Sequence, residues 1–293
     1  MEKNKNINEQ AQRLKDVLTK FAQDDIKDEK IKERILQVVD NCPEILTVPI
    51  VIEKQPGFLN VGNIGMYAAI LKLEWFVLRA LDDKKASLQR DRSGRNLGMA
   101  AAIYRLEKAT IKALDNEKAS VQQDDNGCNI GMYAALACCE KAVLKALDNK
   151  KASVQQDDEG WNIGIAAAWA GLQKAAIKAL DNKKASVQQE EYGRNIGMVA
   201  ADKKLEPVVL KALDNPEASV QQNTRGRNIG MFAALNGLRN ATIKALNNEK
   251  ACAQKDIKGA NIELLAAKMN LEDVSSITVE NELDELEAEL NIK

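Results

Sequence analysis

Apolar and polar residues along the chain recur with a period of 33 residues. The clearest marker is a tetrapeptide, Asn-Ile-Gly-Met, which begins at Asn129 in the middle of the chain. Its exact or near copies begin at Asn63, Asn96, Asn162, Asn195 and Asn228, and a degenerate seventh copy begins at Asn261. A fixed period of this length is typical of stacked-repeat proteins, in which each unit packs on its neighbours. The repeats therefore define the fold, and function must lie in the residues that differ between them.

Each repeat predicts two short helices followed by a polar turn, here called the finger. In the repeat that begins at Asn129, the asparagine suits a helix N-cap and residues 130–135 supply the buried face of a first helix. A second helix is expected at about residues 140–148, with apolar residues on one side and lysines on the other. Residues 151–160 are too polar to continue a helix, and Gly160 suits a tight turn.

The segments before and after the repeats follow other patterns. Residues 8–22 and 28–39 have apolar side chains at helical spacing, which predicts a helix pair that caps the first repeat. Prolines argue against a helix in the insertion at 43–60, for which we expect a loop packed over the first repeat, with a ligand-binding loop as the alternative. Leucines spaced along the acidic residues 280–290 predict one amphipathic helix, which docks on the last repeat or meets a partner.

These patterns predict three parts in the chain. Residues 1–57 form the N-terminal helical cap and the proline-containing insertion, residues 58–260 form six repeats, and residues 261–293 form a capping repeat and the acidic helix. The expected fold class is an all-α solenoid.

Composition removes several classes of function. The chain has 42 basic and 43 acidic side chains and a net charge of −1, so nothing attracts it generally to nucleic acid. It contains no histidine, and its five cysteines form no CxxC pair, so we expect no histidine-based catalysis, no metal site and no cofactor. Free cysteines suit a reducing, cytoplasmic compartment. No apolar run is long enough to span a membrane.

The repeat resembles that of the ankyrin-repeat family, whose unit carries Asp-x-x-Gly-x-Thr-Pro-Leu-His-x-Ala-Ala. Residues 157–168 read Asp-Asp-Glu-Gly-Trp-Asn-Ile-Gly-Ile-Ala-Ala-Ala, so the finger, its glycine and the alanines agree with that unit. The departures recur in most repeats: Asn replaces Thr, Ile replaces Pro, Gly replaces Leu and Met replaces His. The resemblance implies a non-enzymatic module that binds a partner protein in a concave groove formed by the fingers and first helices.

Variable positions of the family, carried over to this sequence, give candidate partner-binding residues. They are Arg92, Arg95, Tyr104, Asp125, Asp158, Glu159, Trp161, Trp169, Glu191, Tyr192, Arg194, Arg225 and Arg227. Trp161, Trp169 and Tyr192 lie in neighbouring repeats, and aromatic residues and arginines are frequent anchors of interfaces. Trp169 packed as core is the alternative, whereas Trp161 precedes an N-cap and is harder to bury. An aromatic centre with acidic finger tips suits a partner that carries basic and apolar groups.

Two other functions remain open from the sequence. Ankyrin-repeat effectors that intracellular bacteria deliver into host cells are similar, and some carry a glutamate-rich C-terminal secretion signal that is not cleaved, which residues 280–293 match loosely. Such an effector would bind and redirect a host protein. The other alternative is an enzyme with a carboxylate-based site near the 43–60 insertion. The paired acids of the fingers recur with the repeat, so we interpret each pair as a solvated turn with one structural acid.

Overall fold

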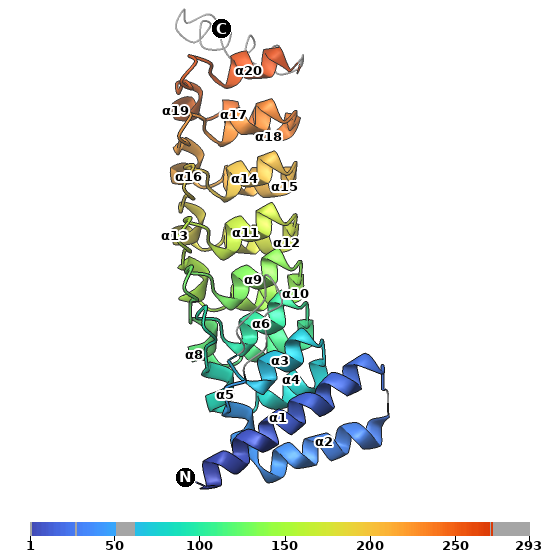
Figure 1. Ribbon diagram of the computed structural model, residues 1–293. Helices are drawn as coiled ribbons and strands as arrows, with labels where there is room; N and C mark the ends of the chain where they lie inside the picture. The colour runs from blue at the N-terminus through green and yellow to red at the C-terminus, as the bar shows by residue number, and fades with distance from the viewer. Residues whose placement is uncertain (1, 27, 51–61, 270, 272–293) are drawn as a thin grey trace, which may run out of the picture. The chain divides into compact units, whose positions relative to one another are not determined.

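The computed structural model describes residues 2–26, 28–50, 62–269 and 271. Within these ranges every regular element is a helix, and none is a strand. Contacts divide the chain into two compact units, residues 1–158 and residues 159–293, which are described separately. In each unit, adjacent helix pairs pack in series (Figure 1). The predicted all-α repeat solenoid is confirmed.

The first unit contains the N-terminal helix pair and three repeats. Its elements are α1 (Glu2–Gln23), α2 (Glu29–Asn41), the 3-10 helix η1 (Pro43–Thr47), α3 (Ile64–Ile70), α4 (Glu74–Ala80), α5 (Lys84–Leu88), α6 (Leu97–Ile103), α7 (Glu107–Ala113), α8 (Glu117–Ser120), α9 (Ile130–Leu136), α10 (Glu140–Ala146) and the 3-10 helix η2 (Ala152–Val154).

The second unit continues the pattern of the first. Its elements are α11 (Ile163–Trp169), α12 (Gln173–Ala179), α13 (Lys183–Ser186), α14 (Ile196–Asp202), α15 (Glu206–Ala212), α16 (Pro216–Val220), α17 (Ile229–Leu235), α18 (Arg239–Leu246), α19 (Glu249–Cys252) and α20 (Ile262–Lys268). The first helices α11, α14, α17 and α20 pack side by side, as do the second helices α12, α15 and α18 (Figure 1).

The N-terminal helix pair covers the first repeat, as its apolar spacing predicts. Leu18 and Phe21 of α1 are buried, and the ring of Phe21 meets that of Trp75 in α4 edge to face, with 5.5 Å between centroids. The insertion is not entirely a loop, because Pro43 starts η1, which buries Ile45 and Leu46. Proline is compatible with a helix at its first position, where no intrahelical bond needs its N–H. Residues 51–61 of the insertion lie outside the described residues.

The asparagine of each Asn-Ile-Gly-Met box caps its first helix and also holds the repeat together. Asn96 is fully buried, and its Oδ1 accepts from the backbone N–H of Met99 at 3.0 Å. Its Nδ2 donates to the carbonyl of Ala119 at 3.0 Å and to Oε1 of Gln122 at 2.8 Å. Equivalent bonds recur in the other complete repeats. One side chain therefore joins the first helix to the segment before the next finger.

A third short helix, which the sequence does not predict, follows the second helix in most repeats. Asn116 caps α8 by accepting from the backbone N–H of Lys118 and Ala119. Its Nδ2 also donates to Oγ of Ser87 in the preceding repeat at 3.2 Å. Residues 151–160 include the 3-10 helix η2, so the expectation of a wholly non-helical segment there is wrong. A helix of one turn can form here because a side-chain cap satisfies its first N–H groups and its alanine is buried.

The glycine of the box lets neighbouring first helices approach closely. A Cβ atom on Gly230 would lie 2.6 Å from Cβ of Ala245 and 2.6 Å from Cδ1 of Ile262 in the next repeat. The last repeat has Glu263 at the corresponding position, and the following Leu264 is 46% exposed. Interior repeats bury the residue at that position completely or almost completely. Glu263 therefore marks the end of the stacked series within the described residues.

Ion pairs connect successive second helices on the surface of each unit. Lys112 lies 2.6 Å from Asp82 of the preceding repeat, and Lys244 lies 2.5 Å from Asp214. Such exposed pairs stabilise a protein by roughly 0–1 kcal/mol each. The ion pairs therefore help to set the register, whereas apolar burial between repeats supplies most of the stability.

Candidate interaction surface

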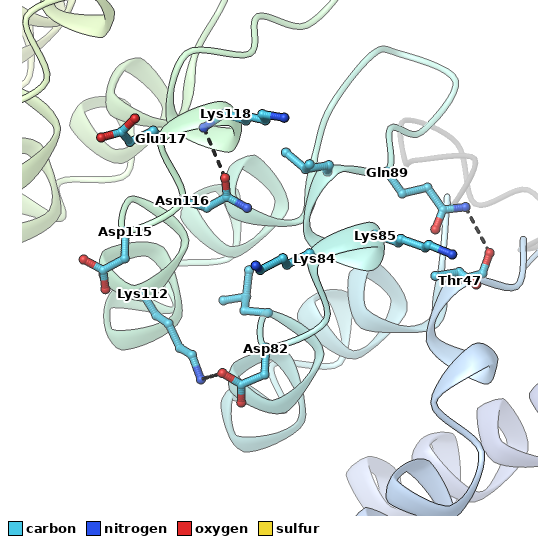
Figure 2. Close-up of a pocket in the computed structure, with 12 residues that line it drawn as sticks. Thr47, Asp82, Lys84, Lys85, Gln89, Lys112, Asp115, Asn116, Glu117 and Lys118 are labelled. Carbon is cyan, nitrogen blue, oxygen red and sulfur yellow. Dashed lines mark hydrogen bonds and ion pairs between the residues drawn. The ribbon is translucent and has the colours of Figure 1, made fainter.

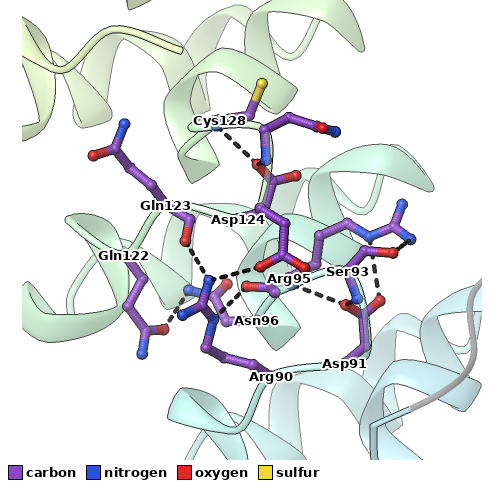
Figure 3. A network of polar contacts seen from close by, with 12 residues as sticks. Arg90, Asp91, Ser93, Arg95, Asn96, Gln122, Gln123, Asp124 and Cys128 are labelled. Atoms are coloured by element: carbon purple, nitrogen blue, oxygen red, sulfur yellow. Dashed lines mark hydrogen bonds and ion pairs between the residues drawn. The ribbon is translucent and has the colours of Figure 1, made fainter. Parts of the chain in front are cut away.

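The base of each finger is built around one acid. In the first unit, Oδ1 of Asp91 accepts from the backbone N–H of Ser93 and of Arg95, both at 2.9 Å, and Oδ2 pairs with Nε of Arg95 at 3.2 Å (Figure 3). Asp124 holds the next finger in the same way. Both carboxylates are buried. The first acid of these fingers is therefore structural, which agrees with the interpretation from the sequence.

The finger tips are tied to one another by backbone hydrogen bonds. In the first unit, the N–H of Asp125 donates to the carbonyl of Ser93 at 3.0 Å. In the second unit, the N–H of Thr224 donates to the carbonyl of Tyr192 at 2.9 Å, and the N–H of Ile257 donates to that of Arg225 at 3.0 Å. Because one such bond joins each neighbouring pair, the side chains at the tips are held at a regular spacing.

The candidate residues of the first unit do not form one exposed patch of aromatic groups. Arg92, Asp125 and Asp158 are exposed, and Asp125 lies 3.6 Å from the guanidinium of Arg90. Arg95 is half-buried and holds its own finger through Asp91. Tyr104 is half-buried at the end of α6, and burial raises the pKa of its hydroxyl. The face of this unit is thus mainly polar at the predicted positions.

The second unit brings its two predicted tryptophans together. Trp161 and Trp169 meet edge to face, with 5.6 Å between ring centroids and 76° between ring planes. Trp169 is 43% exposed, so the alternative that it packs as core is wrong. Trp161 is half-buried and is therefore more enclosed than its position before an N-cap suggests. Nζ of Lys203 lies 3.5 Å from the ring centroid of Trp169, a close cation–π contact.

A chain of charged contacts extends from these rings to the next fingers. Arg194 pairs with Glu190 at 3.1 Å and with Asp202, the neighbour of Lys203, at 3.2 Å. Its guanidinium carbon lies 5.7 Å from the ring centroid of Tyr192, which is 56% exposed. Hydrogen bonding to Glu191 raises the pKa of the Tyr192 hydroxyl. The predicted Arg194 therefore positions its neighbours as well as lying on the surface.

A cavity of about 350 Å³ lies in the second unit, between the finger that contains Tyr192 and the finger that contains Thr224. It is lined by Tyr192, Arg194, Asp202, Asn223, Thr224, Arg225, Arg227 and Phe232. The prediction included four of these residues, Tyr192, Arg194, Arg225 and Arg227. Asn223 lies at the base of a finger, and Phe232 lies within the first helix α17. The variable positions carried over from the family include neither place.

We call the exposed and half-exposed residues of this region the aromatic–arginine face. It comprises Trp161, Trp169, Tyr192, Arg194, Lys203 and Arg225. Glu159 and Glu191 are exposed at finger tips of the same unit. The face thus combines large rings held by neighbouring side chains with charges of both signs.

A larger groove of about 1040 Å³ lies in the first unit, beside the short helices α5 and α8 (Figure 2). Its lining is rich in lysines and also contains Asp82, which pairs with Lys112. Gln89 closes one end by donating to the carbonyl of Thr47 at 3.2 Å. Across the described ranges, no group of acids and cysteines is arranged to hold a metal ion.

The cysteine thiols in the described part of the chain are free. Burial, together with nearby carboxylates that include Asp124 and Asp157, raises the pKa of Cys128 to about 12. Burial likewise raises the pKa of Cys252 to about 11. Because the thiolate is the reactive form, neither thiol suits a nucleophile at neutral pH.

No family model matches the chain, and a comparison with curated proteins finds no match. The class that the structure defines is therefore an all-α repeat protein, and membership of the ankyrin-repeat family stays a prediction from the motifs. In the part of the chain that the structure describes, no helix has both the length and the apolar character needed to cross a membrane.

Proposed function

We propose that this chain is a non-enzymatic binding module that holds a partner protein on the aromatic–arginine face of its second unit. The observation that carries the proposal is Trp169, a large ring that stays 43% exposed while Trp161 and Lys203 fix its orientation. An ordered, exposed tryptophan loses little conformational freedom on binding, so most of the apolar area that a partner covers contributes to affinity.

Comparison between repeats supports a specialised surface at this place. The residue at the position of Trp169 is Leu136 one repeat earlier and Asp202 one repeat later, whereas the boxes before them are nearly the same. The fold needs the box for stacking, but it does not need a tryptophan at this position. The side chain is therefore free to serve recognition.

The charges around the rings indicate a partner with both apolar and charged groups. Glu159 and Glu191 offer exposed carboxylates, while Arg225 offers an exposed guanidinium. Charges at the edge of an interface mainly set specificity and association rate, while the rings at its centre supply affinity. The preferred partner presents an apolar side chain between groups of opposite charge.

The test uses the double variant Trp161→Ala with Trp169→Ala in the full chain. Affinity purification with mass spectrometry first identifies what the wild-type chain captures, and calorimetry with that purified protein then measures affinity. We expect the double variant to lose capture while its circular dichroism spectrum and melting transition stay close to those of the wild type. Leu136→Ala is the matched control, because Leu136 occupies the same repeat position in the first unit and is 50% exposed. Undiminished capture by the double variant, or its failure to fold, would refute the assignment.

The effector alternative depends on residues 280–293, which lie outside the described residues. It stays a prediction, and a translocation assay with and without this segment tests it. The enzyme alternative depends on the insertion, of which residues 51–61 are also outside the described part.

A further inference from the structure

The acid at the base of the finger recurs with the repeat, except at one place. The positions are Asp91, Asp124, Asp157, Glu190, Asn223 and Asp256, each 33 residues after the last. Among these six fingers, only the fifth has a neutral residue there, Asn223. The exception falls in the second unit and lines the cavity described above.

The geometry of the loop does not account for this exception. Oδ1 of Asn223 accepts from the backbone N–H of Arg225 at 3.0 Å and from that of Arg227 at 2.9 Å. Glu190 accepts from the two equivalent N–H groups of its own finger at 3.1 and 3.0 Å. Asparagine therefore folds the loop as a carboxylate does, and what the replacement changes is the charge.

The missing carboxylate leaves two arginines without an acid in their own finger. In the fourth finger, Arg194 pairs with Glu190 of the same finger. In the fifth, Arg227 instead reaches Asp256 of the next finger, through Nε at 3.2 Å. Arg225 is exposed, and among the described residues no carboxylate lies within ion-pair distance of its guanidinium. Arg225 is thus the arginine of the cavity lining that forms no ion pair with a described carboxylate.

We propose that this cavity binds the carboxylate of an aspartate or glutamate side chain from the partner protein, an inference that rests on the proposed function. Arg225 supplies the charge, Thr224 offers a hydroxyl group, and Tyr192 and Phe232 form apolar parts of the lining. Because Tyr192 also belongs to the aromatic–arginine face, an acidic side chain in the cavity and an apolar side chain near Trp169 can come from one peptide segment.

The surrounding charges favour a carboxylate over a phosphate group. The charge of Arg194 is compensated by Glu190 and Asp202, and that of Arg227 by Asp256. Among the residues that line the cavity, Arg225 is the cation without an ion pair to a described carboxylate, which matches a single negative charge. A phosphate dianion would place a second charge close to Asp202, and the lining offers no further unpaired cation to balance it.

The probe is a phage-displayed library of random dodecapeptides, selected on the immobilised full chain. We expect the enriched peptides to share an Asp or Glu, and we expect their synthetic copies, measured by fluorescence anisotropy, to bind Arg225→Gln and Asn223→Asp about tenfold or more weakly. Asn223→Asp keeps the acceptor for the loop N–H groups and restores the periodic carboxylate. Lys250→Gln is the control, because it removes one exposed charge from α19 of the same unit.

Replacing the acid of the peptide by its amide should weaken binding to the wild-type chain and have little effect on Arg225→Gln. Peptides that Trp169→Ala loses but Arg225→Gln and Asn223→Asp retain would overturn this inference and leave the proposed function standing. Failure to enrich any peptide, or peptides that none of these variants affects, would overturn both. Stronger competition by inorganic phosphate than by acetate at equal ionic strength would show a phosphate site instead of a carboxylate site.

Discussion

Replacing the box asparagine Asn195 by alanine should destabilise the second unit far more than the loss of a helix cap alone. Asn195 is fully buried, and its Oδ1 accepts from the backbone N–H of Met198 at 3.1 Å. Its Nδ2 donates to the carbonyl of Ala218 at 3.1 Å and to Oε1 of Gln221 at 2.9 Å. Alanine removes all three bonds and leaves the partner atoms in place.

The magnitude follows from adding these losses. An N-cap lost to alanine costs about 1 kcal/mol. The carbonyl of Ala218 keeps a bond from the backbone N–H of Gln221 at 3.3 Å, so the loss of the Nδ2 bond costs about 0.5–1.5 kcal/mol. Gln221 is only half-buried and can find water, so its loss adds roughly 0.5 kcal/mol. The free energy of unfolding should therefore fall by about 2–3 kcal/mol.

Asn261→Ala is the matched control in the same unit. Asn261 caps α20 by accepting from the backbone N–H of Leu264 at 3.0 Å, but among the described residues its Nδ2 donates only to the exposed Glu263. Its replacement should cost about 1 kcal/mol. Urea unfolding followed by circular dichroism gives the global change.

Hydrogen exchange with mass spectrometry gives the local change. Peptides that cover residues 195–221 should exchange about a hundredfold faster in Asn195→Ala if the repeat opens on its own. Equal losses in Asn195→Ala and Asn261→Ala would refute the reasoning, because they would show that the two amide bonds contribute nothing beyond the cap.

Three further predictions follow from contacts already described. Gly197→Ala should lower the free energy of unfolding, measured by urea titration, by about 1–2 kcal/mol. A Cβ atom at this position would lie 2.7 Å from side-chain atoms of Ala212 and Ile229. The higher helix propensity of alanine offsets only about 1 kcal/mol of the cost of this clash. At pH 8, iodoacetamide should modify the exposed Cys138 well before Cys128, because a pKa of about 12 keeps the Cys128 thiol protonated. Peptide mass spectrometry measures the two rates, and equal rates would contradict the burial of Cys128. The pKa of the Asp256 carboxyl is lowered by hydrogen bonds from backbone N–H groups, first that of Ala260, and by Arg227. As the pH falls, Asp256 is therefore protonated in the unfolded chain before it is protonated in the folded chain, and stability should fall below a pH of about 4. Asp256→Asn should reduce the difference between urea midpoints at pH 5 and pH 3, and an unchanged difference would contradict this role.

Much of the fold could be predicted from the sequence because stacking imposes a period on the chain. The spacing of Asn63 and its copies predicts the start of each first helix, and in the structure each of these first helices begins at the residue after the asparagine. The third helices were not predictable by periodicity, since α8 and its equivalents are only about one turn long and have no apolar stripe to detect. Their signal is instead local, an Asn or Asp cap such as Asn116 followed three residues later by a buried alanine.

The candidate surface was less accessible to sequence reasoning, because exposure depends on packing in three dimensions. Trp169 lies at the end of a first helix, where the neighbouring finger decides whether a ring is covered, and the sequence does not specify that distance. Arg95 and Arg194 look like free surface cations in the sequence, yet folding places each beside a buried carboxylate. Asn223 had a usable signal, since it alone breaks the period of acids.

Glu263 has a consequence for assembly. Identical repeats offer complementary ends, so copies of such a chain could in principle join head to tail into open filaments. At Gly230, the isoleucine of the next repeat fits only because no side chain intervenes. At Glu263, a further repeat stacked on α20 would remove an exposed carboxylate from water, which is strongly unfavourable. One acidic residue thus opposes the stacking of another copy on α20.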